Sequence, residues 1–396
     1  MHSIYLDHHA TTPTDPCVVE AMLPFFTERF GNAGSATHEP GRQARRAVDE
    51  ARQSIADCLG ADSREIVFTS GATESNNLAL RGAAERYASR GRHLISVATE
   101  HPSVLESLSK LARAGYEVTL LPVAPSPAPE AGLIRPEQLA GAIRSDTILV
   151  SVMLANNEIG VLQPVEEIGR VCREHGVVFH CDATQAVGRL PVDVDRLQVD
   201  LMSFTAHKIY GPKGIGALYV RRRERRVSVE PILVGGGQEA GLRSGTLNVP
   251  GIVGFARALE LCRNEMATEA PRLRALRDRT FERLCAQVGG IALNGPSLDR
   301  PELRLAANLN VAFSGIDAES LLATVREVAL SAGSACGSSE PEPSHVLRAL
   351  GLPDPMIRSS VRFGLGRWTT EQQIDQAVDM LATAAQRLRS MLPVAS

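Results

Sequence analysis

Short, continuously apolar runs alternate with helical patterns from about residue 45 to residue 220, and this alternation constrains the fold more than any other feature. Strands that are buried on both faces and separated by helices form βαβ units around a mostly parallel sheet. The first part of the chain is therefore predicted to be an α/β domain. Its expected strands lie at 65–69, 93–97, 147–152, 177–181 and 201–204, with helices over 77–87 and 164–174.

The pattern changes near residue 258. Long amphipathic helices are expected over 265–287 and 370–392, with a strand at 307–313 between them and a kink or restart at Pro271. A chain of 396 residues is too long for one compact core. We therefore expect a large domain over 16–257 and a smaller α+β domain made of residues 1–15 plus 258–396.

Charge and cysteine usage narrow the function classes. The formal net charge of −3 argues against a nucleic-acid binder, and the basic run at 221–226 is interpreted as a solvated turn. The seven cysteines form no C-x-x-C pair, which favours free thiols in a reducing compartment. The sequence contains no signal-peptide pattern and no apolar stretch of membrane-spanning length. A soluble, cytoplasmic protein without a membrane partner is expected.

The segment Thr69-Ser70-Gly71-Ala72-Thr73-Glu74 joins a predicted strand to a predicted helix through small residues. Free backbone N–H groups at a helix start, beside Ser and Thr hydroxyls, form an anion site. The segment is therefore a candidate phosphate cradle. The same residues are also typical of an ordinary capped helix, because Ser and Thr caps are common.

Asp182 and Lys208 each follow a predicted strand. A carboxylate at the end of a central strand faces the crevice in which α/β sheets bind ligands, where it can keep a pyridine nitrogen protonated. A lysine shielded from water at such a place can form a Schiff base. Taken singly, Asp182 is also a candidate helix cap and Lys208 a surface charge. The order of cradle, Asp182 and Lys208 is the order that a pyridoxal enzyme on this sheet requires.

Cys336 lies among Gly, Ser and Ala residues from 331 to 339, with no bulky neighbour to bury it. We expect this segment to be flexible and exposed. The other six cysteines fall in helical or strand patterns and are interpreted as small core residues. Cys336 is therefore the candidate nucleophile, and the alternative is a loop thiol without a role.

Histidines and one asparagine add weaker signals. His8 and His9 have no third ligand near in sequence, so no metal site is expected. His101 follows the predicted strand at 93–97, where a flat ring can stack on a cofactor. Asn157 follows the strand at 147–152 and is placed to bond the phenolic oxygen of such a cofactor.

With these residues in place, the chain resembles the cysteine desulfurases of the NifS/IscS type, which are class-V aminotransferase-like enzymes. The matching segments follow the family order over nearly the whole chain. They include Tyr5-Leu6-Asp7-His8-His9-Ala10-Thr11-Thr12, Ser70-Gly71-Ala72-Thr73-Glu74-Ser75, Thr99-Glu100-His101, Asn156-Asn157-Glu158-Ile159-Gly160, Asp182-Ala183-Thr184-Gln185, His207-Lys208-Ile209-Tyr210-Gly211, Arg243-Ser244-Gly245-Thr246, Ser334-Ala335-Cys336 and Arg362-Phe363-Gly364-Leu365-Gly366-Arg367.

The resemblance implies a fold-type I homodimer that uses pyridoxal 5'-phosphate (PLP), with a mostly parallel seven-stranded sheet and a catalytic-cysteine loop at about 331–344. It also implies residue roles. For the cofactor ring, Lys208 matches the Schiff-base lysine, Asp182 matches the partner of the pyridine nitrogen, Asn157 and Gln185 match the residues near the phenolic oxygen, and His101 matches the ring-stacking catalytic histidine. The phosphate end of the cofactor site is matched by Ala72, Thr73, Thr205, Ala206 and His207, and Thr246 matches a threonine that reaches the phosphate from the other subunit. Arg362 matches the clamp on the substrate carboxylate, with Asn157 beside it, and Cys336 matches the persulfide cysteine.

The implied reaction converts L-cysteine to L-alanine and passes the sulfur from Cys336 to an acceptor protein, such as an iron–sulfur scaffold or a tRNA-thiolation protein. The run Gly337-Ser338-Ser339-Glu340-Pro341 departs from the family pattern, and Pro341 is expected to stiffen the segment after Cys336. Two alternatives stand beside this reading. Another fold-type I enzyme, such as a selenocysteine lyase or aminotransferase, is disfavoured by Cys336. An inactive sulfur carrier is disfavoured by the presence of Lys208, Asp182 and His101.

Overall fold

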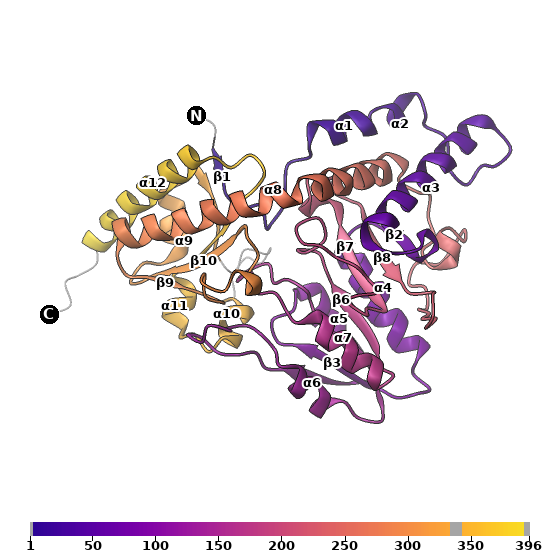
Figure 1. Cartoon of the computed structure of the whole chain (residues 1–396), viewed down its shortest axis with the longest axis horizontal. Helices are drawn as coiled ribbons and strands as arrows, with labels where there is room; N and C mark the ends of the chain where they lie inside the picture. Colours follow the sequence, from indigo (N-terminus) through magenta and orange to yellow (C-terminus); the bar gives the residue numbers. More distant parts are fainter. Residues whose placement is uncertain (1–2, 333–342, 392–396) are drawn as a thin grey trace.

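The computed structural model describes residues 3–332 and 343–391, which form two lobes joined by one long helix (Figure 1). The larger lobe is built on a sheet of seven strands, as expected. Only the strand at 216–220 runs antiparallel to its neighbours. In spatial order the strands are β2 (Ile66–Thr69), β8 (Gly216–Val220), β7 (Leu201–Thr205), β6 (Val178–Asp182), β5 (Thr147–Ser151), β3 (His93–Val97) and β4 (Glu117–Leu121).

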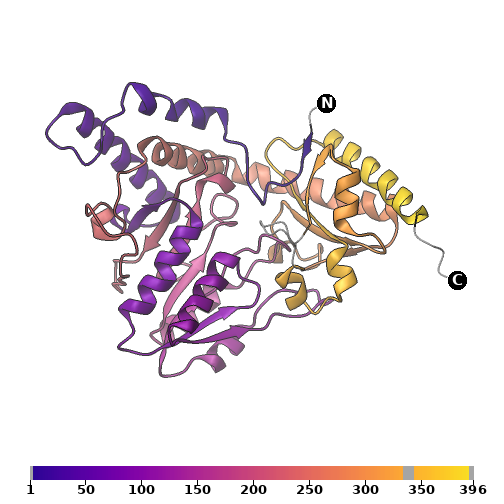
Figure 2. The ribbon, with the colours of Figure 1, turned by 180° about the vertical axis from the view of Figure 1, so that it is seen from behind.

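Helices cover both faces of this sheet, which explains why its strands are apolar throughout (Figure 2). On one face, α4 (Ala72–Arg86) and α5 (Pro102–Arg113) pack through residues such as Leu78 and Leu108. The other face is covered by α3 (Glu39–Leu59), α6 (Pro136–Ala142), α7 (Val165–Glu174) and the first half of α8 (Val249–Val288). Helix α4 begins five residues earlier than the helix predicted at 77–87, directly at the candidate cradle.

The smaller lobe has a second core and an antiparallel sheet. Its strands, in spatial order, are β12 (Ser331–Ala332), β13 (Ser360–Gly364), β10 (Asn308–Phe313) and β9 (Ile291–Leu293). Beside it, β1 (Ile4–Tyr5) pairs in parallel with β11 (Val328–Ala329). The remaining helices are α1 (Pro16–Met22), α2 (Pro24–Thr27), α9 (Ala318–Thr324), α10 (His345–Ala349), α11 (Asp354–Arg358) and α12 (Glu371–Ser390), with short 3₁₀ turns at Ser63–Glu65, Ala206–Lys208, Glu239–Gly241 and Pro301–Leu303.

Helix α8 starts 16 residues before the predicted helix at 265–287 and continues through Pro271 without a break. Its apolar residues change partner near that proline. Leu259 and Cys262 belong to the large core, whereas Leu273 and Leu276 belong to the small one. Ile4 and Leu6 also lie in the small core. We keep the division into 16–257 and 1–15 plus 258–396 as a proposal, with α8 as the shared element.

The register of the large sheet brings the predicted site segments together. Thr69 at the end of β2 and Thr205 at the end of β7 both pair with Gly216 of β8. A side chain at position 216 would place its Cβ 2.7 Å from Cα of Gly71, so this close approach requires glycine. Asp182 at the end of β6 pairs with Ser203 of β7. The carboxyl ends of β2, β6 and β7 therefore meet at one edge of the sheet.

Candidate active site

A cavity of about 940 Å³ lies between the lobes, at the carboxyl edge of the large sheet. Ten of the predicted site residues line it: Ala72, Thr73, His101, Asn157, Asp182, Gln185, Thr205, His207, Lys208 and Arg362. Its size is within the range of sites that enclose a cofactor and a small substrate. Further lining residues come from the N-terminal segment and from the start of α10, for example His9, Ala10, Ser344 and His345.

The first turn of α4 forms one end of the cavity. The helix begins at Ala72 after Gly71, and no side chain caps it. The N–H groups of Ala72 and Thr73 have no intrahelical partner because of their place in the first turn. A Cβ built on Gly71 would lie 3.9 Å from Thr205 Oγ1, so these two residues face each other. The arrangement suits a phosphate group, with the positive end of the helix dipole behind it.

Two other residues at this end are already engaged. The Thr205 hydroxyl donates a 2.9 Å hydrogen bond to the Ile215 carbonyl, so its hydrogen is committed while that bond is made. His207 Nδ1 lies 3.1 Å from Thr11 Oγ1, and burial lowers the pKa of His207 to about 4. A neutral ring is therefore expected at His207 near pH 7. Lys213, which also lines the cavity, provides a positive charge.

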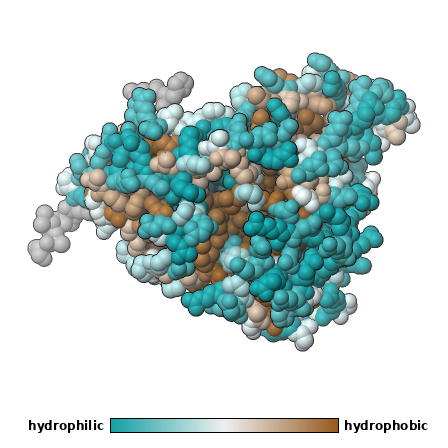
Figure 3. Space-filling view, in the orientation of Figure 1, coloured by the Kyte–Doolittle hydropathy of each residue, from teal (hydrophilic) through white to brown (hydrophobic). Residues whose placement is uncertain are grey.

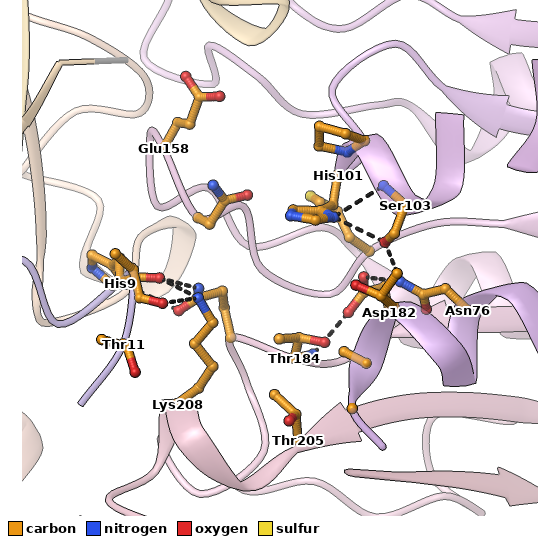
Figure 4. A pocket seen from close by; sticks show the side chains of 18 of the residues that line it. His9, Thr11, Asn76, His101, Ser103, Glu158, Asp182, Thr184, Thr205 and Lys208 are labelled. Atoms are coloured by element: carbon orange, nitrogen blue, oxygen red, sulfur yellow. Dashed lines mark hydrogen bonds between the residues drawn. The ribbon is translucent and has the colours of Figure 1, made fainter. Parts of the chain in front are cut away.

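Asp182 lies on the cavity wall and is only 4% exposed. Its Oδ2 accepts a 2.8 Å hydrogen bond from Asn76 Nδ2, and its Oδ1 accepts one of 2.9 Å from the Thr184 backbone N–H (Figure 4). Within the described part of the chain, no Lys, Arg or His forms an ion pair with it. Buried carboxylates are normally paired with a positive charge. A ligand that brings a protonated ring nitrogen meets this requirement.

Lys208 lines the same cavity as Asp182 (Figure 4). Its Nζ donates hydrogen bonds of 2.6 and 2.7 Å to the backbone carbonyls of His9 and Ala10. The 3₁₀ turn Ala206–Lys208 directly after β7 aims the side chain across the cavity. The amine is thus held by backbone groups of the N-terminal segment, at the edge of the sheet where the Schiff-base lysine was predicted.

His101 is the N-cap residue of α5, and its Nδ1 accepts a 3.1 Å hydrogen bond from the Ser103 backbone N–H. The same nitrogen lies 2.9 Å from Ser103 Oγ. In the neutral ring the proton must then be on Nε2. Burial is the main cause that lowers the pKa of His101. The residue offers a flat, neutral ring, which is suitable for stacking on a cofactor.

Arg362 connects the small lobe to the cavity. It forms a 2.9 Å ion pair with Asp7, donates to Ser331 Oγ at 3.2 Å and donates to the backbone carbonyl of Asn157 at 3.2 Å. Its Nε is buried and has no hydrogen-bond partner among the described residues. One N–H of the guanidinium therefore remains available for a carboxylate, and Asn157 lies beside it.

Of the predicted site residues, Gln185 lines the cavity with an amide that is already engaged, whereas Ala206 and Thr246 do not line it. The Gln185 amide is engaged with His9, through Nδ1 at 3.0 Å and the backbone carbonyl at 3.0 Å. Ala206 is fully buried next to the cavity wall. Thr246 is exposed and does not line the cavity of its own chain. Cys336 lies outside the described residues.

Sequence reasoning missed the residues that hold Asp182 in place. Asn76 on α4 is fully buried and donates both to Asp182 and, at 2.9 Å, to Ser103 Oγ. The only local signal was an asparagine at the fifth position of a helix, where burial of an amide is unusual. The contribution of His9 and Ala10 had no local signal, because only the fold brings the N-terminus to Lys208.

Two interpretations of the sequence were wrong. Among the cysteines expected in the core, Cys17 and Cys285 are exposed, because they lie on the solvent faces of α1 and α8. The basic run at 221–226 is not a fully solvated turn. Arg221 is completely buried and donates to the Asp195 carboxylate at 2.7 Å and to the Val199 and Val194 carbonyls.

The donor set fits PLP. The helix start at Ala72 offers free N–H groups, the buried Asp182 carboxylate has no cationic partner among the described residues, and the Lys208 amine lines the same cavity. These groups correspond to the three features of PLP that a protein must bind, namely its phosphate, its ring nitrogen and its aldehyde.

Comparisons with known proteins agree with this geometry. The aminotransferase class-V family matches residues 4–377. A cysteine desulfurase IscS from Anaeromyxobacter sp. (strain Fw109-5) is 52% identical over 391 residues, which cover 99% of this chain and 94% of the relative. A solved NifS-like protein superposes with a TM-score of 0.88 at 36% identity, covering 98% of this chain and all of that one. The structure of SspA in complex with cysteine gives a TM-score of 0.78 at 38% identity, covering 92% and 99%.

The family match spans most of the chain, and the curated relative is similar over nearly its full length. The solved structures share both the two-lobed fold and substantial sequence identity. The protein therefore belongs to the class-V aminotransferase family, among the cysteine desulfurases of the NifS/IscS type.

Proposed function

We propose that the protein is a PLP-dependent cysteine desulfurase that converts L-cysteine to L-alanine and keeps the sulfur as a persulfide on Cys336. The observation that carries the proposal is that Lys208, Asp182 and Arg362 line one cavity, in a chain whose curated relatives are named cysteine desulfurase. The role of Cys336 is supported by the sequence resemblance, because the residue lies outside the described part of the structure.

Each of several cavity residues has a separate role in the proposed reaction. When bound, PLP supplies an electron sink for reactions at the α-carbon of an amino acid. Asp182 would keep the proton on the ring nitrogen, and the N–H groups of Ala72 and Thr73 would hold the phosphate. Lys208 would bind the aldehyde carbon and, once released by the substrate, move a proton at the α-carbon. His101 would cover the ring.

Arg362 is the proposed binding site for the carboxylate of L-cysteine. A guanidinium binds carboxylates with directed hydrogen bonds, and the Arg362 Nε is buried without a hydrogen-bond partner among the described residues. The ion pair with Asp7 fixes the guanidinium plane on its other side. Asn157, whose carbonyl accepts from Arg362, would lie next to the substrate.

The test is to incubate the PLP-loaded protein with L-cysteine and to quantify alanine and protein-bound sulfur by mass spectrometry. Wild type should release alanine and carry one additional sulfur atom on the peptide that contains Cys336. The Cys336→Ser variant should bind PLP and lose both signals. Cys285→Ser is the matched control, because Cys285 is an exposed thiol on the outer face of α8 and does not line the cavity.

Other outcomes separate the alternatives. Keto-acid formation with amination of the cofactor would identify an aminotransferase. Turnover of selenocysteine without turnover of cysteine would identify a selenocysteine lyase. Wild-type alanine production by Cys336→Ser would remove the persulfide role. Candidate acceptor proteins, including an iron–sulfur scaffold and a tRNA-thiolation protein, can be added after the cysteine step. The acceptor is the one that removes the additional sulfur.

The active form is proposed to be a homodimer. Large apolar side chains are exposed around α1 and α2, namely Leu23, Phe26 and Phe30, with 56%, 58% and 71% exposure (Figure 3). Exposed apolar side chains that lie close together in the chain are typical of protein interfaces, which supports the proposal. Thr246 is exposed on its own chain, which supports its assignment to the cavity of a partner subunit. Light scattering of wild type and of Phe30→Glu tests this, and a monomeric wild type would contradict it.

Within the described part of the chain, no helix combines the length and apolar character needed to span a bilayer. The six described cysteines are all free thiols. Free thiols are typical of reducing compartments, and they support the proposal of a cytoplasmic location.

A further inference from the structure

The ion pair between Arg243 and Glu74 lies at the end of the candidate phosphate cradle. Arg243 follows the glycine-rich segment at 235–241, and Glu74 is the third residue of α4. The Arg243 Nε donates to Glu74 Oε1 at 2.8 Å, and a terminal nitrogen of the guanidinium donates to Oε2 at 3.3 Å. The two side chains are only 21% and 17% exposed. The pair is therefore bidentate and largely withdrawn from solvent, unlike the weak pairs of an open surface.

Glu74 brings a negative charge into the wall of the active-site cavity. Its Oε2 also accepts a 2.7 Å hydrogen bond from the Ser70 backbone N–H, which fixes the carboxylate beside the turn before α4. Burial opposes ionisation of this group, but the hydrogen bonds from Arg243 and Ser70 outweigh burial and hold the pKa of Glu74 below its ordinary value. An anion thus lies within one helical turn of the Ala72 and Thr73 N–H groups.

A carboxylate in this position opposes the binding of a phosphate. Like charges that lie close together repel, and both anions are attracted by the same helix N-terminus. The other groups at this end of the cavity do not remove the conflict. Lys213 provides one positive charge, and His207 is neutral near pH 7 because burial lowers its pKa to about 4. Without a cation on Glu74, the charges of Glu74 and Lys213 would cancel.

Arg243 reaches Glu74 from outside the cofactor site. It is not among the described residues that line the active-site cavity. It lies instead in the wall of a neighbouring cavity of about 330 Å³, which shares Ser70, Thr73 and Glu74 with the active-site cavity. The guanidinium can therefore neutralise the carboxylate without occupying the place of the phosphate.

The segment that carries Arg243 is anchored to the same connection between β2 and α4. The Glu239 carboxylate, on a side chain that is 2% exposed, accepts hydrogen bonds of 2.6 and 2.7 Å from Arg52 and one of 2.7 Å from the Phe68 backbone N–H. Glu239 and Ala240 have left-handed backbone conformations, with φ of 49° and 54°. Residues other than glycine keep such conformations only where their surroundings fix them. The buried carboxylate supplies this constraint and holds the segment beside α4.

We propose that Arg243 sets the affinity of the cradle for the cofactor phosphate by neutralising Glu74 from outside the cavity. Arg243 is in this sense a positioning residue, because it acts through Glu74. The inference rests on PLP as the cofactor and not on the fate of the sulfur, so it goes beyond the proposed desulfurase function. Loss of the Arg243 charge should weaken the binding of PLP more than that of pyridoxal, which has the same ring and aldehyde but no phosphate.

The test compares these two ligands in absorbance titrations of the cofactor-free protein. Arg243→Gln keeps a hydrogen-bond donor but not the charge, so the Kd of PLP should rise about tenfold, as expected for one uncompensated charge near a bound anion. The Kd of pyridoxal should be unchanged. Arg243→Lys keeps the charge and should restore most of the PLP affinity. Arg86→Gln, whose exposed pair with Glu230 lies at the other end of α4, is the matched control and should leave both Kd values unchanged.

A double variant separates the effect of charge from the effect of structure. Glu74→Gln removes the negative charge, and its amide oxygen can still accept from the Ser70 N–H. Combined with Arg243→Gln, it should return the Kd of PLP to the wild-type range, because no carboxylate remains to be neutralised.

Two results would overturn the proposal. One is an equal weakening of PLP and pyridoxal binding in Arg243→Gln, which would indicate a general loss of structure. The other is a double variant that binds PLP no better than Arg243→Gln alone. Failure of the proposed desulfurase function is distinguishable, because the binding pattern would then be present while wild type released no alanine from cysteine.

Discussion

Lys208 Nζ donates a 2.6 Å hydrogen bond to the backbone carbonyl of His9, which joins the predicted cofactor lysine to a segment 199 residues earlier in the chain. The contact is continued by Arg189, which donates to the Lys208 carbonyl at 2.9 Å and to the His8 carbonyl at 3.1 Å. The N-terminal segment is thus part of the cavity wall. It also belongs to the core of the small lobe through Ile4 and Leu6, so the cavity is physically tied to both lobes.

Lys208→Ala should give a folded protein without the yellow absorbance of a lysine-bound PLP, because no other amine occupies the place after β7. Added PLP should be removed by gel filtration from the variant and retained by wild type. Lys213→Ala is the matched control, since Lys213 lines the same cavity but lies in the turn before β8. Its absorbance should persist. Full colour in Lys208→Ala would remove the Schiff-base assignment.

Asn76→Ala should weaken the cofactor site by removing a hydrogen bond that holds Asp182 in place. Asn76 donates to Asp182 and to Ser103 Oγ in a fully buried position. Loss of both bonds leaves buried acceptors unsatisfied, which costs about 2 kcal/mol. The free energy of unfolding of the cofactor-free protein should fall by that amount in urea titrations, and the Kd of PLP should rise about tenfold in absorbance titrations.

The neighbouring Asn77→Ala is the control for this experiment. Asn77 donates to the Thr73 carbonyl on the exposed side of the same helix. Its loss should change the unfolding free energy by less than about 0.5 kcal/mol. Equal effects of the two substitutions would show that Asn76 has no special role beneath Asp182.

The parts of the site that lie at strand ends could be predicted from the sequence. Asp182 and Lys208 follow strands whose apolar runs are recognisable locally, and parallel strands bring their carboxyl ends to one edge. The strand β8 was not predicted, although it is the element that places the α4 turn beside β7. Strand β8 pairs with both Thr69 and Thr205, and the five residues of the strand do not indicate with which distant strands it pairs.

Contacts between residues that are far apart in the chain could not be predicted from local sequence patterns. The ion pair of Arg362 with Asp7 joins residues 355 positions apart, and His345 meets the Glu100 carbonyl over 245 positions. The resemblance to a family supplied Arg362 as a candidate but not its partner.

Arg367→Met should destabilise the junction between the lobes. The Arg367 guanidinium is 10% exposed, pairs with Asp15 at 2.8 Å and with Glu265 of α8 at 2.9 Å, and lies 4.3 Å from the centre of the Tyr210 ring. Removal of the cation leaves Asp15 buried without its partner, at a cost of about 3 kcal/mol. Urea unfolding measures this loss. Arg196→Met breaks the exposed pair with Glu166 and should change stability by less than about 1 kcal/mol.

Stability should fall as the pH drops from about 6.5 to about 4, and His180 should contribute one proton to this dependence. His180 is fully buried between Ser151 Oγ at 2.8 Å and Ser203 Oγ at 3.0 Å, and burial lowers its pKa to about 4. Its pKa in the unfolded chain is about 6.5. Between these values the unfolded state binds the additional proton, so the free energy of unfolding decreases with acidity by up to about 1.4 kcal/mol per pH unit. Above pH 6.5 the His180 ring is neutral in both the folded and the unfolded chain, so it no longer makes the free energy of unfolding depend on pH.

The His180→Gln variant isolates this contribution. Glutamine can bond to the same hydroxyls but does not titrate, so the loss of stability between pH 7 and pH 4.5 should be about 2 kcal/mol smaller than in wild type. A residual slope is expected in the variant, because burial also lowers the pKa values of His8, His9 and His207. Urea titrations at four or more pH values measure the slopes. Identical slopes in the two proteins would mean that the ring stays uncharged in the unfolded chain as well, or that the native site admits the proton, and either result would remove His180 from the acid response.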